Sequence, residues 1–200
     1  MSQQTFNDGD ELSVVQSTIN NNSTDAESRL GIIENGGFGG FIDYNDTLTA
    51  SSPIVLLADT WTTITNNGLG AFTNKTYRPD GISELMDVST GSIDATGLSL
   101  GDSMLIRNDF TITPNTNNAS LEFRYQLGGG GNEYTLDKRL GRLDEGSGVG
   151  YRFSLSPDLI YMGDLNTKGN PISLQIKLSA SGSAVNAGSA IQVIRYKGIS

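Results

Sequence analysis

Hydrophobic and polar residues alternate along most of the chain after Thr47. In LEFRYQL, residues 121–127, every second side chain is apolar, and LQIKL, residues 174–178, repeats the pattern. A period of two is typical of a strand with one face against a core and the other face in solvent. Clusters of Gly, Asn, Asp and Pro, which favour turns, separate such runs. The pattern predicts strands at 53–59, 61–65, 70–79, 82–89, 102–114, 119–128, 151–163, 172–181 and 190–198.

Many short strands with Gly-rich turns and few helical runs predict a mainly β protein, an antiparallel β-sandwich, and within that class we expect a jelly roll spanning residues 47–200. Two long connections, 127–150 and 163–171, interrupt the strand pattern. Long loops on a rigid sandwich are a usual place for recognition. The candidate recognition residues on these connections are Glu133, Tyr134, Lys138, Arg139, Arg142, Asp164, Asn166 and Lys168.

Residues 1–34 follow a different period. Their apolar positions are separated by steps of three, four and seven, which predicts a short N-terminal helical segment with an apolar stripe. Asp8 and Glu11 have the spacing of a capping box. Thr24 and Glu27 have it as well, so either one helix or two shorter ones fit the segment. The stripe, expected to serve anchoring or trimerisation, consists of Leu12, Val15, Ile19, Ala26, Leu30 and Ile33.

The helical stripe requires a partner, because an isolated helix of about 20 residues is marginal in water. It can pack on its own domain, on identical copies or on a larger assembly. The run NGGFGGF, residues 35–41, is typical of a flexible join, and residues 35–46 are expected to form a Gly-rich linker. Such a linker separates the stripe from the sandwich and therefore favours a partner outside the chain.

Composition and charge exclude several classes of function. The chain has 13 Lys and Arg against 22 Asp and Glu, a formal net charge of −9, and no basic block that could follow a phosphate backbone. Nucleic acid and membrane are therefore not expected partners. The first residues carry no basic start followed by an apolar stretch, so we expect synthesis in a cytoplasm without a classical export signal.

Histidine and cysteine are both absent, which removes His-based triads, thiolate chemistry and the commonest zinc ligands. Catalysis would have to rest on carboxylates, such as a pair drawn from the connection 127–150. Acidic residues there stand beside Lys and Arg, which favours a mixed-charge surface. We therefore expect no enzyme and no cofactor. The acidic residues in question are Glu133, Asp137, Asp144 and Glu145.

The run DLNTKGN, residues 164–170, begins like a calcium loop. Its fifth position is Lys168 and its twelfth is Gln175, so a cation would meet a positive charge and would lack a bidentate acid. We expect a polar turn and no metal. Trp61, inside a strand-like run, is expected to pack in the core.

Several runs resemble those of a known class of protein. FNDGDELSVVQSTINNN, residues 6–22, resembles the N-terminal segment of small phage fibre and virion structural proteins, in which it precedes a distal β domain. The later runs resemble the trimeric jelly-roll knobs of the tumour necrosis factor and C1q type found on such proteins. Those runs are GLSLGDSMLIRNDFTITP (97–114), GRLDEGSGVGYRFSLSPDLIYMGD (141–164) and LQIKLSASGSAVNAGSAIQVIR (174–195).

The resemblance implies a homotrimer that is located in the virion, anchored by its N-terminus to other phage proteins, with an outward β knob. A tail fibre that binds a host-surface glycan is the first hypothesis for function. The alternative is a capsid decoration, or cement, protein that stabilises the phage head. A carboxylate-based glycan depolymerase is the third hypothesis. The resemblance leaves attachment to tail or capsid open.

Overall fold

The computed structural model describes residues 20–24 and 39–195, and the chain divides into two units, Met1–Gly37 and Phe38–Ser200. In the first unit, residues 20–24 are helical, and the Thr24 hydroxyl donates to the Asn20 carbonyl oxygen at 2.9 Å. The predicted stripe lies outside the described residues, so its role stays a prediction. Its members are Leu12, Val15, Ile19, Ala26, Leu30 and Ile33.

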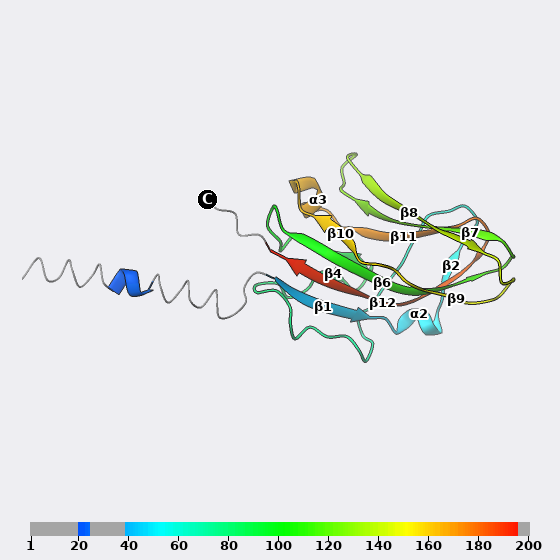
Figure 1. Cartoon of the computed structure of the whole chain (residues 1–200), viewed down its shortest axis with the longest axis horizontal. Helices are drawn as coiled ribbons and strands as arrows, with labels where there is room; N and C mark the ends of the chain where they lie inside the picture. The colour runs from blue at the N-terminus through cyan, green and yellow to red at the C-terminus, as the bar shows by residue number, and fades with distance from the viewer. Residues whose placement is uncertain (1–19, 25–38, 196–200) are drawn as a thin grey trace, which may run out of the picture. The chain divides into compact units, whose positions relative to one another are not determined.

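The second unit contains two main antiparallel sheets, which form two layers in Figure 1. We name the larger one sheet A. Its strands are β1 (Gly39–Asn45), β2 (Ile54–Leu56), β6 (Ser103–Pro114), β9 (Tyr151–Ser154), β10 (Asp158–Tyr161) and β12 (Gly182–Ile194). We name the other sheet B. Its strands are β3 (Thr62–Thr63), β7 (Ala119–Leu127), β8 (Tyr134–Leu143) and β11 (Ser173–Leu178).

Three smaller features complete the described part of this unit. The strands β4 (Met86–Asp87) and β5 (Ser92–Ile93) pair with each other. The helices α2 (Leu48–Ser51) and α3 (Leu165–Gly169) are each a single short turn.

The strand order is that of a jelly roll. Along the chain, the positions that build the two sheets are β1, β3, β6, β7, β8, the β9/β10 pair, β11 and β12. Sheet A has the order β1-β12-β6-β10, with β9 also paired to β6, which corresponds to positions one, eight, three and six. Sheet B has the order β3-β11-β7-β8, which corresponds to positions two, seven, four and five. Strands from the two ends of the chain thus pair, as two Greek keys require. The predicted fold class is confirmed.

The core lies between the two sheets, where alternate side chains of facing strands meet. The strands β7 and β11 alternate buried and half-buried residues, as their sequences predict. Phe110 of sheet A stacks on Phe123 of sheet B with ring centres 6.0 Å apart, and Tyr125 meets the edge of Phe123 at 5.0 Å. Burying each such ring contributes about 1.5–3 kcal/mol, so these rings help to hold the layers together.

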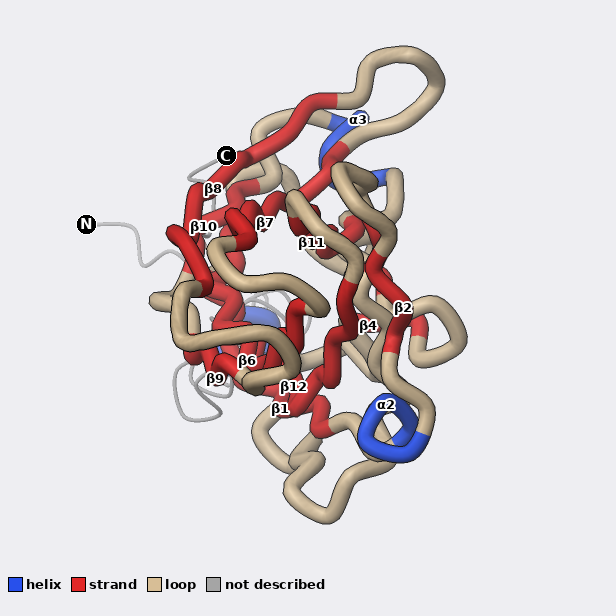
Figure 2. The backbone as a smooth tube through the Cα atoms, turned by 90° about the vertical axis from the view of Figure 1, so that its right-hand side faces the viewer, coloured by secondary structure: helices blue, strands red, loops and turns tan. Residues whose placement is uncertain are grey.

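The sandwich has two poles, which we name by where the chain enters. At the near pole, Gly39 at the start of β1 pairs with Ile194 at the end of β12. At the far pole, Pro114 at the end of β6 pairs with Gly182 at the start of β12. Figure 2 views the molecule from the far pole. The far-pole connections are residues 115–118, 144–150 and 179–181.

The expected linker 35–46 is wrong for residues 39–45, which form β1, so the sandwich begins before residue 47. The glycines there allow close approach of two backbones. A Cβ at Gly39 would lie 2.4 Å from the Val193 carbonyl oxygen, and one at Gly40 would lie 2.4 Å from the Pro79 nitrogen. On the side of β1 away from β12, Phe41 N donates to the Tyr77 carbonyl oxygen at 2.7 Å.

Two further expectations about the strands are wrong. The connection expected at 127–150 contains β8, a strand paired with β7 along its whole length. The strands expected at 70–79 and 82–89 are mostly turns, and only Met86–Asp87 of the second pairs as a strand. The segment 70–79 instead follows β1 through single backbone contacts such as Asp43 N to the Asn74 carbonyl oxygen at 2.9 Å.

Candidate functional site

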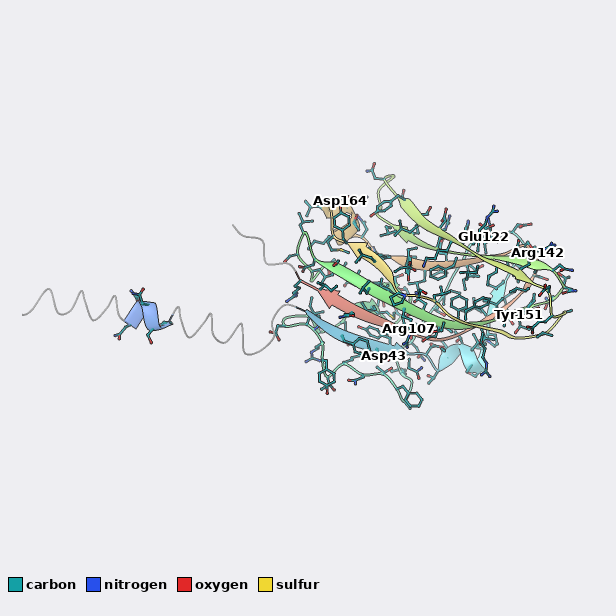
Figure 3. All side chains as sticks on the ribbon, in the orientation of Figure 1. Asp43, Arg107, Glu122, Arg142, Tyr151 and Asp164 are labelled. Carbon is teal, nitrogen blue, oxygen red and sulfur yellow. The ribbon has the colours of Figure 1, made fainter. Side chains whose placement is uncertain are left out.

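The candidate recognition residues separate into groups at different places on the sandwich. Figure 3 shows Asp164 and Arg142 at opposite ends of it. Five of them lie at the near pole: Asp164 caps α3, Asn166 and Lys168 lie on it, Glu133 precedes β8 and Tyr134 is the first residue of β8. Lys138, Arg139 and Arg142 lie on β8 itself.

The near-pole residues are engaged in holding their own loops. Asp164 caps α3, accepting from Thr167 N at 2.7 Å and from the Thr167 hydroxyl at 2.9 Å. These bonds lower the pKa of the Asp164 carboxyl, since they stabilise its ionised form, and the bond from the Thr167 backbone has the larger effect. Lys168 Nζ donates to the Thr96 carbonyl oxygen at 2.7 Å. The run DLNTKGN is therefore a capped helical turn, and no cluster of metal-ligating residues exists in the described parts of the chain.

Asn166 fastens the glycine-rich connection 128–133 to α3. Its Oδ1 accepts from Gly129 N at 3.0 Å, and its Nδ2 donates to the Asn132 carbonyl oxygen at 2.9 Å. The Tyr134 hydroxyl shares a hydrogen bond with Thr167 Oγ1 at 2.8 Å. The side chain of Glu133 accepts from the nearby backbone N–H of Gly131 at 3.2 Å. This group consequently orders the near pole.

Lys138 points toward the opposite sheet, where it forms an ion pair with Asp158 of β10. Beside this pair, Asn108 Nδ2 donates to the Tyr125 hydroxyl at 2.5 Å, and Asn108 Oδ1 accepts from Ser189 Oγ at 2.8 Å. Burial, followed by the charge of Asp158, raises the pKa of Tyr125 above its ordinary value. Lys138 therefore joins the two sheets at their open edge.

The outer face of sheet B is an extended polar surface. Trp61 lies there half-buried, so the expectation of core packing is wrong. The Arg124 guanidinium lies 4.1 Å and Lys177 Nζ 4.8 Å from the centre of the indole ring, within range of cation–π attraction. Arg124 Nε also donates to Gln175 Oε1 at 2.7 Å, and Gln175 Nε2 donates to Gln126 Oε1 at 3.0 Å.

A depression of about 250 Å³ lies on this face beside Arg139 and Arg142. It forms where the pairing of β7 with β8 shifts between Leu121 and Glu122. A register shift of this kind is a β-bulge, which bends the strand and redirects side chains. Gly141, whose φ is +122°, lies between the two arginines in the sequence and lines the depression. Here two predicted recognition residues, Arg139 and Arg142, line a concave surface.

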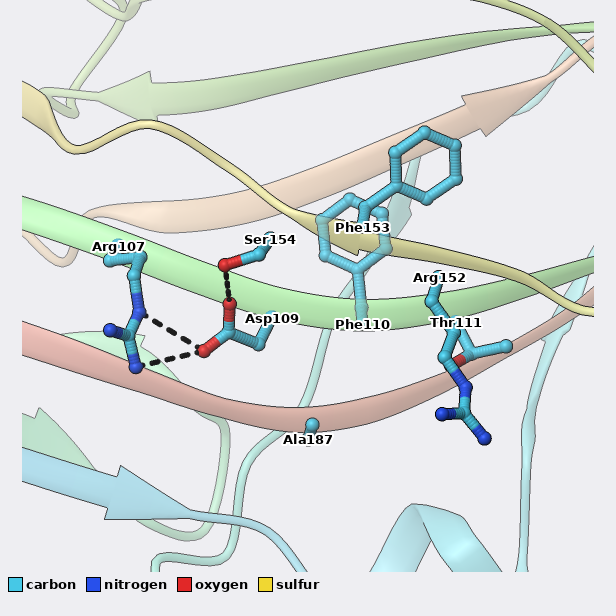
Figure 4. Close-up of a pocket in the computed structure, with 8 residues that line it drawn as sticks. All are labelled: Arg107, Asp109, Phe110, Thr111, Arg152, Phe153, Ser154 and Ala187. Carbon is cyan, nitrogen blue, oxygen red and sulfur yellow. Dashed lines mark hydrogen bonds and ion pairs between the residues drawn. The ribbon is translucent and has the colours of Figure 1, made fainter.

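A second depression, of about 660 Å³, lies on the outer face of sheet A (Figure 4). Asp109 accepts from Arg107 Nε at 3.1 Å and from the Ser154 hydroxyl at 2.5 Å. The pKa of nearby Asp43 is raised, mainly by burial, while the charge of Arg107 opposes the rise and that of Asp109 adds to it. The positive charge of Arg107 is thus balanced by carboxylates. Sequence reasoning missed this surface, because its residues come from strands far apart in the chain.

The acidic residues considered for catalysis are distributed along β8 and the residues on either side of it. Glu133 precedes β8 and Asp144 follows it. A strand of this length separates them by about 30 Å, at about 3.3 Å a residue, well beyond the separation of roughly 5–9.5 Å that paired glycosidase carboxylates require. The described surfaces instead offer guanidinium, amide and indole groups, which bind by hydrogen bonding, charge and stacking. None of the described helices is long and apolar enough to cross a membrane.

Comparison with known proteins gives matches among solved structures alone. No family model matches the sequence, and no curated protein matches it. The Eiger TNF from S. frugiperda is 10% identical, with a TM-score of 0.45, over 82% of this chain and 94% of that chain. A chain of the T13 IBDV viral particle is 14% identical, with a TM-score of 0.41, over 78% of this chain and 31% of that one. The PRD1 vertex protein P5 is 19% identical, with a TM-score of 0.38, over 80% and 73%.

This chain therefore spans about a third of the length of the IBDV chain that it matches.

Proposed function

We propose that the protein is a phage virion structural protein, a trimeric fibre anchored to the particle by its N-terminus, whose C-terminal β knob binds the host surface. Its partners would be its own copies, other virion proteins and a host glycan. The proposed role requires neither catalysis nor a metal, in keeping with the absence of His and Cys. The resemblance of residues 6–22 to the anchor segment of such proteins favours this role.

The observation that carries the proposal is that the chain enters and leaves the sandwich at the same end. The chain enters at Gly39 and leaves at Ile194, which are paired neighbours at the near pole. An anchor that precedes residue 39 would thus connect at one end of the sandwich and leave the far pole free to face outward. This is the geometry that a knob on a stalk requires.

The far pole is also well ordered. Asn115 N donates to the Ser181 carbonyl oxygen at 2.9 Å, and Asn115 Nδ2 donates to Ser181 Oγ at 3.1 Å. The Asn115 carbonyl oxygen in turn accepts from Ser147 Oγ at 2.6 Å. Three connections from distant parts of the chain are thereby tied together. A surface that is already ordered loses less entropy when it binds, which supports a binding role.

For the trimer, we propose the outer face of sheet A near the near pole as the surface buried between copies. Strand register places Leu159, Leu105, Gln192 and Phe41 in one row across β10, β6, β12 and β1. Leu159 is 60% exposed in the single chain, so this row offers apolar area for burial.

The alternative role, a capsid decoration protein that clamps neighbouring capsid subunits, has one observation in its favour. The edge strand β2 and the residue after it expose two large apolar side chains, Val55 at 70% and Leu57 at 61%. An exposed apolar edge is suited to docking on another protein. Labelled antibody against the protein distinguishes the two roles on intact virions. It should bind at the tail if the protein is a tail fibre and at the head if it is a decoration protein.

The anchor itself is tested with Val15→Asp and Ile19→Asp together. We expect the double variant to be lost from purified virions by at least tenfold, because burying a carboxylate in an apolar interface is costly and the cost recurs in each copy. Quantitative immunoblotting of virions measures the loss. The control is Ser13→Asp with Ser17→Asp, which adds the same charge off the stripe and should leave incorporation unchanged. Normal incorporation of the stripe variant would contradict the anchoring role.

A further inference from the structure

The outer face of sheet B differs in charge from the protein as a whole. The chain has a net charge of −9, yet the outward positions of β7, β8 and β11 carry more cations than carboxylates. The register places Arg142 opposite Ser120, Arg139 opposite Glu122, and Glu122 opposite Lys177. The charged residues of this face are Arg124, Arg139, Arg142, Lys177, Glu122 and Asp137.

Two of these cations are already engaged. Lys177 Nζ forms an ion pair with Glu122 Oε2 at 3.1 Å, and Arg124 bonds to Gln175 and lies over the indole of Trp61. Within residues 39–195, neither Arg139 nor Arg142 forms an ion pair or a side-chain hydrogen bond. The one carboxylate that lines the depression beside them is thus the one that Lys177 neutralises.

The depression gives these two guanidinium groups a common space. Arg139, Arg142 and Ser120 line it together, and apart from Gly141 and its two chain neighbours no atom of the described chain lies within 4 Å of the position that a Cβ at Gly141 would occupy. Guanidinium groups form paired, charge-assisted hydrogen bonds with planar carboxylates and with phosphates. The Ser120 hydroxyl adds a polar group on the opposite wall. The concave shape, the two unpaired cations and the hydroxyl together fit an anion of the size of a carboxylate or phosphate.

We propose that the depression between Arg139, Arg142 and Ser120 binds the acidic group of an anionic surface glycan. This inference rests on the proposed host-binding role and assigns it a class of ligand. The row that contains Arg139 continues across β7 and β11 toward Trp61. At a strand spacing of about 4.8 Å, these ends are about 14 Å apart, which leaves room for neighbouring sugar units along the face.

The depression on sheet A does not present two unpaired guanidinium groups. Its Arg107 is held by Asp109 at 3.0 Å and faces the charge of Asp43. Its other cation, the exposed Arg152, forms no ion pair within residues 39–195, so this depression has one unpaired guanidinium where the depression on sheet B has two. Arg152 is therefore a suitable control position.

The test measures binding of the full-length protein to three polymers: polygalacturonate, which carries carboxylates, poly(glycerol phosphate), which carries phosphates, and neutral dextran. We expect binding to at least one of the two acidic polymers and none to dextran. Arg139→Gln with Arg142→Gln should weaken that binding at least tenfold, since charged hydrogen bonds to the anion are lost. The preferred polymer identifies the acidic group as carboxylate or phosphate.

The matched control is Arg78→Gln with Arg152→Gln, two exposed arginines outside this face that change the net charge equally. It should bind within twofold of the unmodified protein, and thermal melting should show both double variants folded. An equal loss in both variants would overturn the proposal in favour of a general charge effect. So would an unchanged affinity in Arg139→Gln with Arg142→Gln, equal binding to dextran, or no binding to either acidic polymer.

Adsorption of the same proteins to host cells separates this inference from the proposed function. If the unmodified protein adsorbs and the Arg139/Arg142 variant adsorbs equally, the anion site is wrong while the fibre role stands. If acidic polymers bind through these arginines but virions do not contain the protein, the site stands while the fibre role fails.

Discussion

At the scale of single residues, Tyr44 shows how a buried polar group is held in this fold. The side chain is fully buried, its hydroxyl donates to Glu84 Oε2 at 2.9 Å, and it accepts from Leu85 N at 2.7 Å. Burial, the largest cause, raises the pKa of Tyr44 above its ordinary value. The hydroxyl therefore stays protonated and links β1 to the segment before β4.

We expect Tyr44→Phe to lower the free energy of unfolding by about 1–3 kcal/mol, because Leu85 N–H then lacks an acceptor inside the protein. Urea unfolding measures the change. Tyr77→Phe is the control, since Tyr77 is 68% exposed, and it should shift stability by no more than about 0.5 kcal/mol. Equal effects of the two substitutions would contradict the assigned hydrogen bonds.

At the scale of elements, the sequence predicts a strand well where one face of the strand is buried and the other exposed, and poorly where the strand lacks this contrast. The strands β7 and β11 have one face in the core, so alternation predicts them. The strand β8 is exposed over most of its length because it is the last strand of sheet B, and a strand without a buried face shows no alternation. The sequence of β1 predicts a linker because glycines fit either a flexible segment or a close approach of two backbones, and sequence alone does not distinguish these.

The role of β1 is tested by comparing fragments 38–200 and 46–200. The shorter fragment lacks Ile42 and Tyr44, both fully buried, whose burial contributes together about 3–6 kcal/mol. For a domain of this size, that loss lowers the melting temperature by at least about 6 °C. Circular dichroism during heating measures the difference. Equal melting of the two fragments would show that β1 is dispensable, as a linker would be.

At the scale of the whole sandwich, the described strands begin and end together at the near pole, where Gly39 pairs with Ile194. The sequence indicated Arg139 and Arg142 as recognition residues, although it placed them on a loop. It did not indicate Trp61 or Arg124 as part of that surface, because their contact depends on the pairing of strands more than 60 residues apart, through β11. The candidate site was therefore predictable in its charged residues and not in its shape.

The central claim is a trimeric virion fibre, and the mass of the intact protein in solution tests it most directly. Multi-angle light scattering at micromolar concentration should give three times the chain mass of 21.3 kDa, because the proposed trimer buries both the N-terminal stripe and the apolar row on sheet A between copies. A mass of 21.3 kDa under the same conditions would contradict the account.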